Sequence, residues 1–506
     1  MKKILSILFV LIGFISHGQK QNTYLITDFG AKPNGKTVNT VFIQEAIDRA
    51  SLNGGGKVII PAGYFVTGVI YLKNNVELNI IEGAVLLGST DRFDYGKQKV
   101  EALITAKNQH HISITGSGEI NGRGRELVKD IFIKLNNGLL EDDQWKLNHP
   151  SEKNRPSLIN FIDCDSVTIK NITLKNAAGW VQNYLRCNHL VVDSITVNST
   201  EYWNNDGIDI VNSKNVSITN SFIDAADDAI CLKSEGLILD SCVNIYVANC
   251  KLRSSANAFK IGTGSVGGFR NIKVRDLTIY DTYRAAIALE AVDGGFIENV
   301  DIATVHAINT GCAIFIKLGH RNNSKKYSTI KHIKITNLTV KVPSYKPDIG
   351  YPVEGPLSNY PHNIFPSSIT GIPGYPVTDV LLENITIDYD GGARKSIAQF
   401  CIDTLNRVPE NRAAYPEFSM FGELPCWGMY LRHVKGVAMK NITFKMQEPD
   451  YRPAIIFDDI NRLDVNVIKI VSPKLVPVIV LNKVKNYTVG ELQLPVDGKQ
   501  AIKIIP

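Results

Sequence analysis

A short phrase recurs along most of this chain, and it restricts the possible folds more than any other feature. Each copy begins with Asn or Ser and continues as an alternating run rich in Val, Ile and Thr. Copies begin at Ser166, Asn171, Asn215, Asn244, Asn271, Asn299, Asn337, Asn384 and Asn441. From Asn215 to Asn299 the recurrence is about 28 residues, a length that suits one coil of a solenoid.

The repeated unit predicts strands rather than helices. It alternates with a period of two, is rich in β-branched residues and is bounded by Asn, Asp, Ser or Gly. Successive units lack the Asn-Gly pairs that close hairpins, which favours parallel stacking. A leucine-rich repeat needs a Leu framework, and a propeller blade needs four strands in about 40 to 50 residues. We therefore expect an all-β parallel β-helix with about three strands per coil, in which the Asn residues stack rather than carry glycans.

The length of 506 residues would otherwise suggest about three domains, but a continuous repeat predicts one, over residues 20–506. Apolar residues at helical spacing predict a short capping helix over residues 40–50. Two stretches rich in Pro, Gly and Tyr, about 341–378 and 407–425, read as ordered loop insertions. Such loops could close one end of a cleft and favour attack at a chain end.

Residues 1–19 have the pattern of a signal peptide. Lys2 and Lys3 precede an apolar run from Ile4 to Ile15, and small or polar residues follow near Gly18 and Gln19. We expect an exported chain, periplasmic or secreted, without a membrane span, because no later run approaches about 20 apolar residues.

Charge and cysteine content exclude other classes. The 55 Lys and Arg against 49 Asp and Glu leave a charge of +6 without a basic cluster, so nucleic acid is not an expected partner. The eight Cys include no C-x-x-C pair, so no zinc site is expected. Export permits disulfides, but several Cys lie in strand-like runs, where a small buried side chain is the favoured interpretation.

The densest acidic group points to sugar chemistry. Asp206 precedes Asp227 and Asp228 by 21 to 22 residues, about one coil, which would bring the three together on adjacent turns. Glycoside hydrolysis needs one carboxylic acid to protonate the leaving oxygen and one carboxylate to activate water. Both Asp227 and Asp228 can reach one cleft only if the chain bends there. Asp209 alternates with isoleucines and reads as structural, and Tyr202 could stack on a sugar or pack between coils.

At these residues the chain resembles glycoside hydrolase family 28, the polygalacturonases and rhamnogalacturonan hydrolases. The opening phrases from Thr27 to Ala31 and from Asn53 to Gly63, and the run from Gly116 to Gly122, are similar to that superfamily. The resemblance implies a right-handed parallel β-helix, inversion, and no metal or cofactor. It implies a base role for Asp206, in Asn-Asn-Asp-Gly, and it implies Asp227 as general acid and Asp228 as partner base.

Two motifs of that family are absent, and the difference bears on the substrate. Asn257 stands where polygalacturonases carry the His of Gly-His-Gly, and Ala288 and Glu290 stand where they carry the Arg and Lys of Arg-Ile-Lys. That basic pair holds a galacturonate carboxylate. The Glu290 carboxylate would repel a galacturonate carboxylate, unless a cation from another coil supplies the charge (Lys260, Arg284, Lys317 or Arg321), but it can accept the hydroxyls of a neutral sugar. The candidate substrate-binding residues are Asn257, Lys260, Arg284, Glu290 and Lys317, with Arg321 and His320 as weaker ones.

Three functions stay open at this stage. The first is an exported glycoside hydrolase acting on a pectic or related polysaccharide, as a monomer. The second is a polysaccharide lyase on the same fold, in which clustered Asp residues would hold Ca²⁺ while an Arg or Lys abstracts a proton. The third is a non-catalytic carbohydrate-binding β-helix.

Overall fold

The computed structural model describes residues 22–143, 150–237, 240–322, 325–351, 363–473, 476–496 and 500–506. The expected signal peptide therefore lies outside the described residues. Within them, no helix is both long and apolar enough to cross a bilayer.

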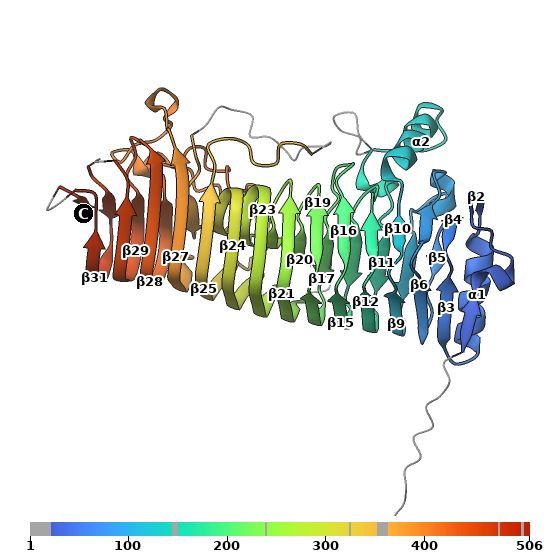
Figure 1. Cartoon of the computed structure of the whole chain (residues 1–506). Coiled ribbons are helices and arrows are strands. Elements are labelled where there is room, and N and C mark those ends of the chain that lie inside the picture. Colours follow the sequence, from blue (N-terminus) through green and yellow to red (C-terminus); the bar gives the residue numbers. More distant parts are fainter. Residues whose placement is uncertain are drawn as a thin grey trace, which may run out of the picture.

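The strands form one elongated stack in which each coil lies on the one before it (Figure 1). Every pairing between named strands is parallel, so the predicted parallel β-helix is confirmed. The first twenty strands are β1 Thr23–Leu25, β2 Asn34–Val38, β3 Gly56–Ile60, β4 Gly63–Thr67, β5 Ile70–Tyr71, β6 Val76–Ile80, β7 Ala84–Gly88, β8 Ile104–Lys107, β9 His110–Thr115, β10 Glu119–Asn121, β11 Ile159–Ile162, β12 Asp165–Lys170, β13 Thr173–Lys175, β14 Gln182–Leu185, β15 Asn188–Asp193, β16 Thr196–Ser199, β17 Ile208–Val211, β18 Lys214–Thr219, β19 Phe222–Ala225 and β20 Ile230–Ser234.

Each coil contributes one strand to each of three faces. Strands β11, β12 and β13 pair with β14, β15 and β16, which pair in turn with β17, β18 and β19. Most of the twelve later strands are longer, and several run on through a corner, although three of them have only four residues. The later strands are β21 Cys242–Ser254, β22 Phe259–Ser265, β23 Phe269–Ala291, β24 Phe296–Leu318, β25 Thr329–Val342, β26 Ser367–Thr370, β27 Val377–Gly391, β28 Met429–Glu448, β29 Ile455–Val471, β30 Ile479–Asn482, β31 Lys485–Gln493 and β32 Ile502–Ile505.

The repeated Asn marks a corner of the coil. Asn215, Asn244, Asn271 and Asn299 all have a positive φ, between 54° and 59°, which Asn tolerates better than most residues. Their amides form a ladder along the stack. Asn244 Nδ2 donates to Asn215 Oδ1 at 3.0 Å, Asn271 Nδ2 donates to Asn244 Oδ1 at 3.0 Å, and Asn299 Nδ2 donates to Asn271 Oδ1 at 3.2 Å. The predicted stacking of these side chains is confirmed.

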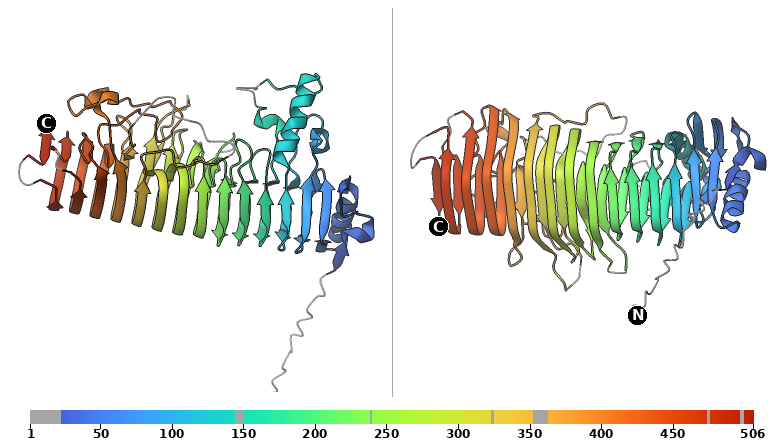
Figure 2. Two further views of the ribbon diagram at one scale, coloured as in Figure 1. Left: turned by 45° about the horizontal axis from the view of Figure 1, so that its top comes forward. Right: turned by 60° about the horizontal axis from the view of Figure 1, so that its bottom comes forward.

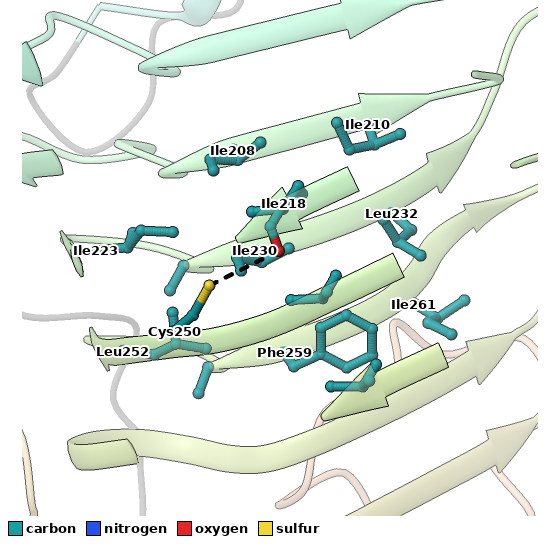
Figure 3. Close-up of a cluster of buried hydrophobic side chains, with 14 of the residues drawn as sticks. Ile208, Ile210, Ile218, Ile223, Ile230, Leu232, Cys250, Leu252, Phe259 and Ile261 are labelled. Carbon is teal, nitrogen blue, oxygen red and sulfur yellow. Dashed lines mark hydrogen bonds between the residues drawn. The ribbon is translucent and has the colours of Figure 1, made fainter. Parts of the chain in front are cut away.

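The interior of the stack is filled by the inward-facing residues of the strands (Figure 3). Ile208, Ile230 and Phe259 occupy the same place in three successive coils, and each is fully buried. Period-two alternation therefore gives a continuous apolar core along the axis, which stabilises neighbouring coils together.

Helix α1, Thr40–Leu52, covers the first coils and confirms the predicted capping helix (Figure 1). A second helix, α2 Gly124–Asn136, was not predicted from the sequence. It projects from the same side of the stack as the C-terminal loops (Figure 2). All eight Cys are free thiols and seven are buried, in line with their interpretation as small core residues.

The two predicted insertions are only partly loops. Strand β26 lies within 341–378 and belongs to a coil, and residues 352–362 lie outside the described part. The second insertion is longer than 407–425, because no strand intervenes between Gly391 and Met429. Its apolar residues, among them Leu405, Phe418 and Phe421, pack on the outer face of the stack against Phe315 and form a second core.

The Asn ladder generates a test with a matched pair of variants. Asn271→Ala removes two amide hydrogen bonds and keeps a Cβ at positive φ without the amide that favours this conformation, whereas Asn271→Gly removes the same bonds and also the Cβ. We expect the Ala variant to unfold at a lower temperature than the Gly variant, by the equivalent of about 1 kcal/mol. Thermal unfolding followed by circular dichroism checks this, and an equal or larger loss for Gly would contradict it.

Candidate active site

The acidic residues meet on one side of the stack because two adjacent coils turn there. Asp206 lies just before β17, and Asp227 and Asp228 lie in the bend between β19 and β20. The pairing of β17 with β20 brings the two turns together, and one carboxylate oxygen from each of the three residues lies within 4.8 Å of the other two. The bend lets neighbouring aspartates reach the same site, as the sequence required.

Gly207 permits this close approach of the turns. A Cβ at this position would lie 2.5 Å from the carbonyl oxygen of Ala229 and 2.5 Å from Cγ2 of Ile223. Its backbone N–H donates to the carbonyl oxygen of Asp228 at 2.9 Å. The glycine that follows Asp206 therefore sets the distance between the two acidic turns.

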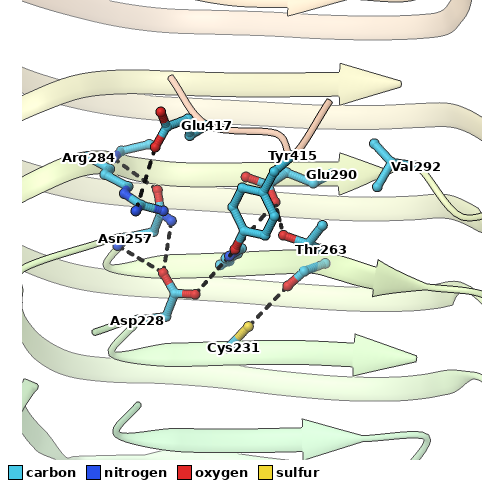
Figure 4. A network of polar contacts seen from close by, with 12 residues as sticks. Asp228, Cys231, Asn257, Thr263, Arg284, Glu290, Val292, Tyr415 and Glu417 are labelled. Carbon is cyan, nitrogen blue, oxygen red and sulfur yellow. Dashed lines mark hydrogen bonds and ion pairs between the residues drawn. The ribbon is translucent and has the colours of Figure 1, made fainter. Parts of the chain in front are cut away.

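Asp228 is held as a carboxylate by donors from the next coils (Figure 4). Asn257 donates to its Oδ1 from the backbone N at 3.0 Å and from Nδ2 at 2.8 Å, and Lys260 Nζ donates to its Oδ2 at 2.9 Å. Burial raises the pKa of Asp228, but the charges of Lys260 and Arg284 and these hydrogen bonds outweigh it and lower the pKa to about 2. This group is ionised at neutral pH.

Asp227 has the opposite environment. Burial and the neighbouring charges of Asp206 and Asp228 raise the pKa of Asp227 to about 7. Its Oδ2 accepts a long hydrogen bond, 3.5 Å, from Asn204 Nδ2, and Asn204 is itself held by Arg155 Nη2 at 2.7 Å. A carboxylic acid that keeps its proton near neutral pH can act as a general acid.

Asp206 shares a buried lysine with a second carboxylate. Lys233 Nζ lies 3.0 Å from Asp206 Oδ2 and 2.7 Å from Asp209 Oδ1, and 3.6 Å from the centre of the Trp180 ring. Asp209 is fully buried, and burial raises its pKa well above the usual value. Burial lowers the pKa of Lys233, but the charges of Asp206 and Asp209 outweigh it and raise the pKa. Sequence reasoning missed both Lys233 and Trp180; a lysine inside an otherwise apolar strand was the available signal.

Asn257, Lys260 and Glu290, predicted to bind substrate, lie next to the acidic cluster. The Asn257 amide bridges two coils, because its Oδ1 accepts from Ala285 N at 3.1 Å while its Nδ2 donates to Asp228. Glu290 accepts from Thr263 Oγ1 at 2.8 Å and lies 3.8 Å from Lys260 Nζ. Burial raises the pKa of Glu290 to about 7, against the opposing effect of Lys260.

The other predicted cations are engaged by neighbours. Arg284 Nη2 lies 3.6 Å from Glu417 Oε2, and Arg321 forms two bonds of 2.9 Å with Asp293. Lys317 donates to the carbonyl oxygen of Glu410 at 2.9 Å, away from the aspartates, and burial lowers its pKa to about 7.

Aromatic side chains divide between packing and exposure. His320 stacks on Tyr327 with ring centres 4.1 Å apart. Tyr202 is buried, whereas Trp203 beside it is 37% exposed.

The long insertion between β27 and β28 walls the site on its C-terminal side. Tyr415 Oη accepts from Lys260 Nζ at 3.4 Å, and Glu417 faces Arg284 (Figure 4). On the N-terminal side a cavity of about 160 Å³ is lined in part by Glu152, Arg155 and Trp180. The site is thus closed toward the C-terminus and hollowed toward the N-terminus.

Asp206, Asp227 and Asp228 are the residues that could together hold a metal ion in the described part of the chain. Lys233 and Lys260 already place ammonium groups 3.0 and 2.9 Å from Asp206 and Asp228. The donor set therefore suits acid and base chemistry better than cation binding.

Comparisons with known proteins identify the family and the fold. The model of glycosyl hydrolases family 28 matches residues 56–400. An exo-poly-alpha-D-galacturonosidase of Dickeya chrysanthemi is 26% identical over 319 residues, which cover 53% of this chain and about half, 52%, of that enzyme. An exopolygalacturonase of Zea mays is 26% identical over 432 residues, covering 77% of this chain and 93% of that enzyme. A solved family 28 exopolygalacturonase of Yersinia enterocolitica shares the fold, with a TM-score of 0.61 at 20% identity over 94% of this chain and 79% of that one.

The raised pKa of Asp227 predicts a pH-dependent effect on stability. The group is neutral in the folded state below pH 7 but ionises above about pH 4 when unfolded, so its contribution to folding is lost as pH rises through about 7. Asp227→Asn should therefore stabilise the protein above pH 7, on the order of 2 kcal/mol, and should change little near pH 4. Unfolding midpoints at the two pH values check this, and an equal effect at both would contradict it.

Proposed function

Because the chain belongs to glycosyl hydrolases family 28, we propose that it is an exported hydrolase that cleaves an O-glycosidic bond of a pectic polysaccharide by inversion. Export rests on the pattern of residues 1–19. The observation that carries the mechanism is the division of the aspartates into one protonated and two lysine-paired groups. Asp227 is the general acid, and Asp206 and Asp228 are the bases.

The reaction needs a protonated carboxyl group and an ionised carboxylate at the same time. Asp227 gives its proton to the glycosidic oxygen as the bond to the anomeric carbon breaks. Asp206 or Asp228 takes a proton from the water whose oxygen bonds to that carbon. Asp227 keeps its proton up to about pH 7 while Asp228 stays ionised down to about pH 2, so both forms coexist across the intervening range.

The separation of the carboxyl groups does not by itself set the stereochemical outcome. Inverting enzymes usually hold their carboxyl groups about 6.5–9.5 Å apart, to leave room for water. Here the nearest carboxylate oxygens lie within 4.8 Å. Inversion is therefore supported by family membership, and the anomer first released, observed by proton NMR, tests it directly.

The substrate we favour carries a neutral sugar at the cleavage point, as in rhamnogalacturonan. Lys260 and Arg284, the cations beside Asp228, already face the carboxylates of Glu290 and Glu417. A galacturonate carboxylate would have to displace one of these, whereas Glu290 can accept sugar hydroxyls. The curated relatives are named for galacturonan cleavage, so homogalacturonan is the essential comparison substrate.

The lyase and the silent binding protein are less well supported. A calcium-dependent lyase would need the aspartates free for the ion, but two of them are paired with lysines. A binding module would have no use for a carboxylic acid held near pKa 7 between two further carboxylates.

Activity should disappear with the acid and should fall at alkaline pH. Asp227→Asn is expected to lower the rate of sugar release by about 100- to 10,000-fold. For the unmodified enzyme, kcat/KM should decline above about pH 7, as Asp227 loses its proton. Reducing-sugar assays on rhamnogalacturonan, homogalacturonan and sulfated galactans measure both effects. Asp276→Asn, an exposed position on β23, is the matched control, and unchanged release by Asp227→Asn would refute the assignment.

The wall on the C-terminal side predicts attack at a chain end. The insertion packs its apolar residues on the outer face of the stack and places Tyr415 and Glu417 beside the site. We expect mono- or disaccharide products from the first minutes, with a slow fall in the viscosity of the polymer. A ladder of intermediate sizes in early samples, separated by anion-exchange chromatography, would show internal cleavage instead.

A further inference from the structure

Two buried lysines occupy corresponding places in the site, and the mechanism above uses them only as partners of the two bases. Lys233 lies on β20 and Lys260 on β22, the strand that pairs with it. We propose that these two lysines are positioning residues that assign the proton of the acidic cluster to Asp227. The proposal rests on the proposed function and adds what selects the acid from three like groups.

Lys233 joins a carboxylate of the site to one beneath it. Its Nζ lies 3.0 Å from Asp206 Oδ2 and 2.7 Å from Asp209 Oδ1. The Trp180 ring covers this Nζ, with the ring centre 3.6 Å away. Asp206 is 4% exposed and Asp209 is fully buried, so water screens these charges poorly. The ammonium charge therefore acts on Asp206 at close range with little screening by water.

Lys260 repeats this arrangement one coil further on. Its Nζ lies 2.9 Å from Asp228 Oδ2 and 3.8 Å from Glu290 Oε2. Tyr415 lies over it, with its Oη 3.4 Å away. Each lysine thus bridges one aspartate of the cluster and one further buried carboxylate.

Asp227 lies between the two pairs and has no such partner. Among the residues that the structure describes, no ion pair within 4.0 Å joins its carboxylate to a lysine or arginine; Asn204 and the backbone N–H of Asp228 are its recorded donors. Three carboxylates this close cannot all ionise, because like charges raise one another's pKa. The proton therefore stays on the carboxyl that lacks a cation.

Other charged groups around the cluster do not change this order. Glu152 and Arg155 face Asp206 from the N-terminal side. Arg284 acts on Asp227 and Asp228 together and is shared with Glu417 from the loop. Within the described part of the chain, Lys233 and Lys260 are the cations that form an ion pair with one aspartate of the cluster each.

The test removes one lysine and follows the pH profile. Lys233→Met should shift the acidic limb of kcat/KM upward by about 1–3 pH units, because Asp206 loses its cation. KM should stay within about threefold, because the lysine acts through Asp206 rather than on substrate. Lys233→Arg should restore much of the original profile.

Asp209 supplies the matched controls. In Asp209→Asn, Lys233 keeps Asp206 as its charged partner, so the acidic limb of kcat/KM should not move to higher pH. Lys233→Met by itself leaves Asp209 buried without a cation, which could prevent folding. The double variant Lys233→Met/Asp209→Asn removes both charges, and its acidic limb of kcat/KM should move to higher pH as it does in Lys233→Met. A limb that stays in place in the folded double variant would overturn the proposal.

A measurement without substrate separates this proposal from the proposed function. Difference infrared spectroscopy of the ligand-free protein, with ¹³C-labelled aspartate, records the pH at which carboxyl groups lose their protons. We expect one carboxyl titrating near pH 7 in the unmodified protein, absent in Asp227→Asn, and a further carboxyl titrating at higher pH in the double variant. If no glycan is cleaved but these shifts occur, the proposed function fails and the role of the lysines stands; if the shifts are absent, the lysines do not place the proton.

Discussion

Parallel stacking in register is the constraint on which the rest of the molecule depends. Each coil pairs its strands with the coil before it, so residues far apart in the chain come to lie side by side: Ile208 lies beside Ile230, 22 positions on, and Ile230 lies beside Phe259, 29 positions on. The Asn ladder and the apolar interior both follow from this, because corresponding positions of successive coils carry the same kind of residue. The site is a local use of the same rule: Asp206 and Asp228 are neighbours because β17 and β20 are.

The site departs from the repeat in one respect, which is charge. Along the Asn ladder, stacked positions of successive coils carry the same residue, and identical amides can donate hydrogen bonds to one another. At β17, β20 and β22 the chain instead brings carboxylates together and compensates them with Lys233 and Lys260. Burying such charges is costly unless they are paired. The pairing is incomplete, and the carboxyl left over, Asp227, is the one that holds a proton near pH 7.

The insertion between β27 and β28 shows how a solenoid acquires a closed site. A stack of coils by itself offers an open groove. Here a loop rich in apolar residues packs on the outer face and brings Tyr415 and Glu417 to Lys260 and Arg284. The wall therefore places its own polar groups beside the two cations of the site.

The sequence by itself determined the repeat, the strand class, the capping helix and the meeting of the three aspartates, because each depends on local periodicity or on one coil length. It left α2, the strand within 341–378 and the true extent of the second insertion unrecognised. Only the tertiary structure decided which carboxyl carries the proton and which cations are engaged. Those properties depend on burial and on partners such as Lys233, Asp209 and Glu417, whose distances in space no spacing in the chain records.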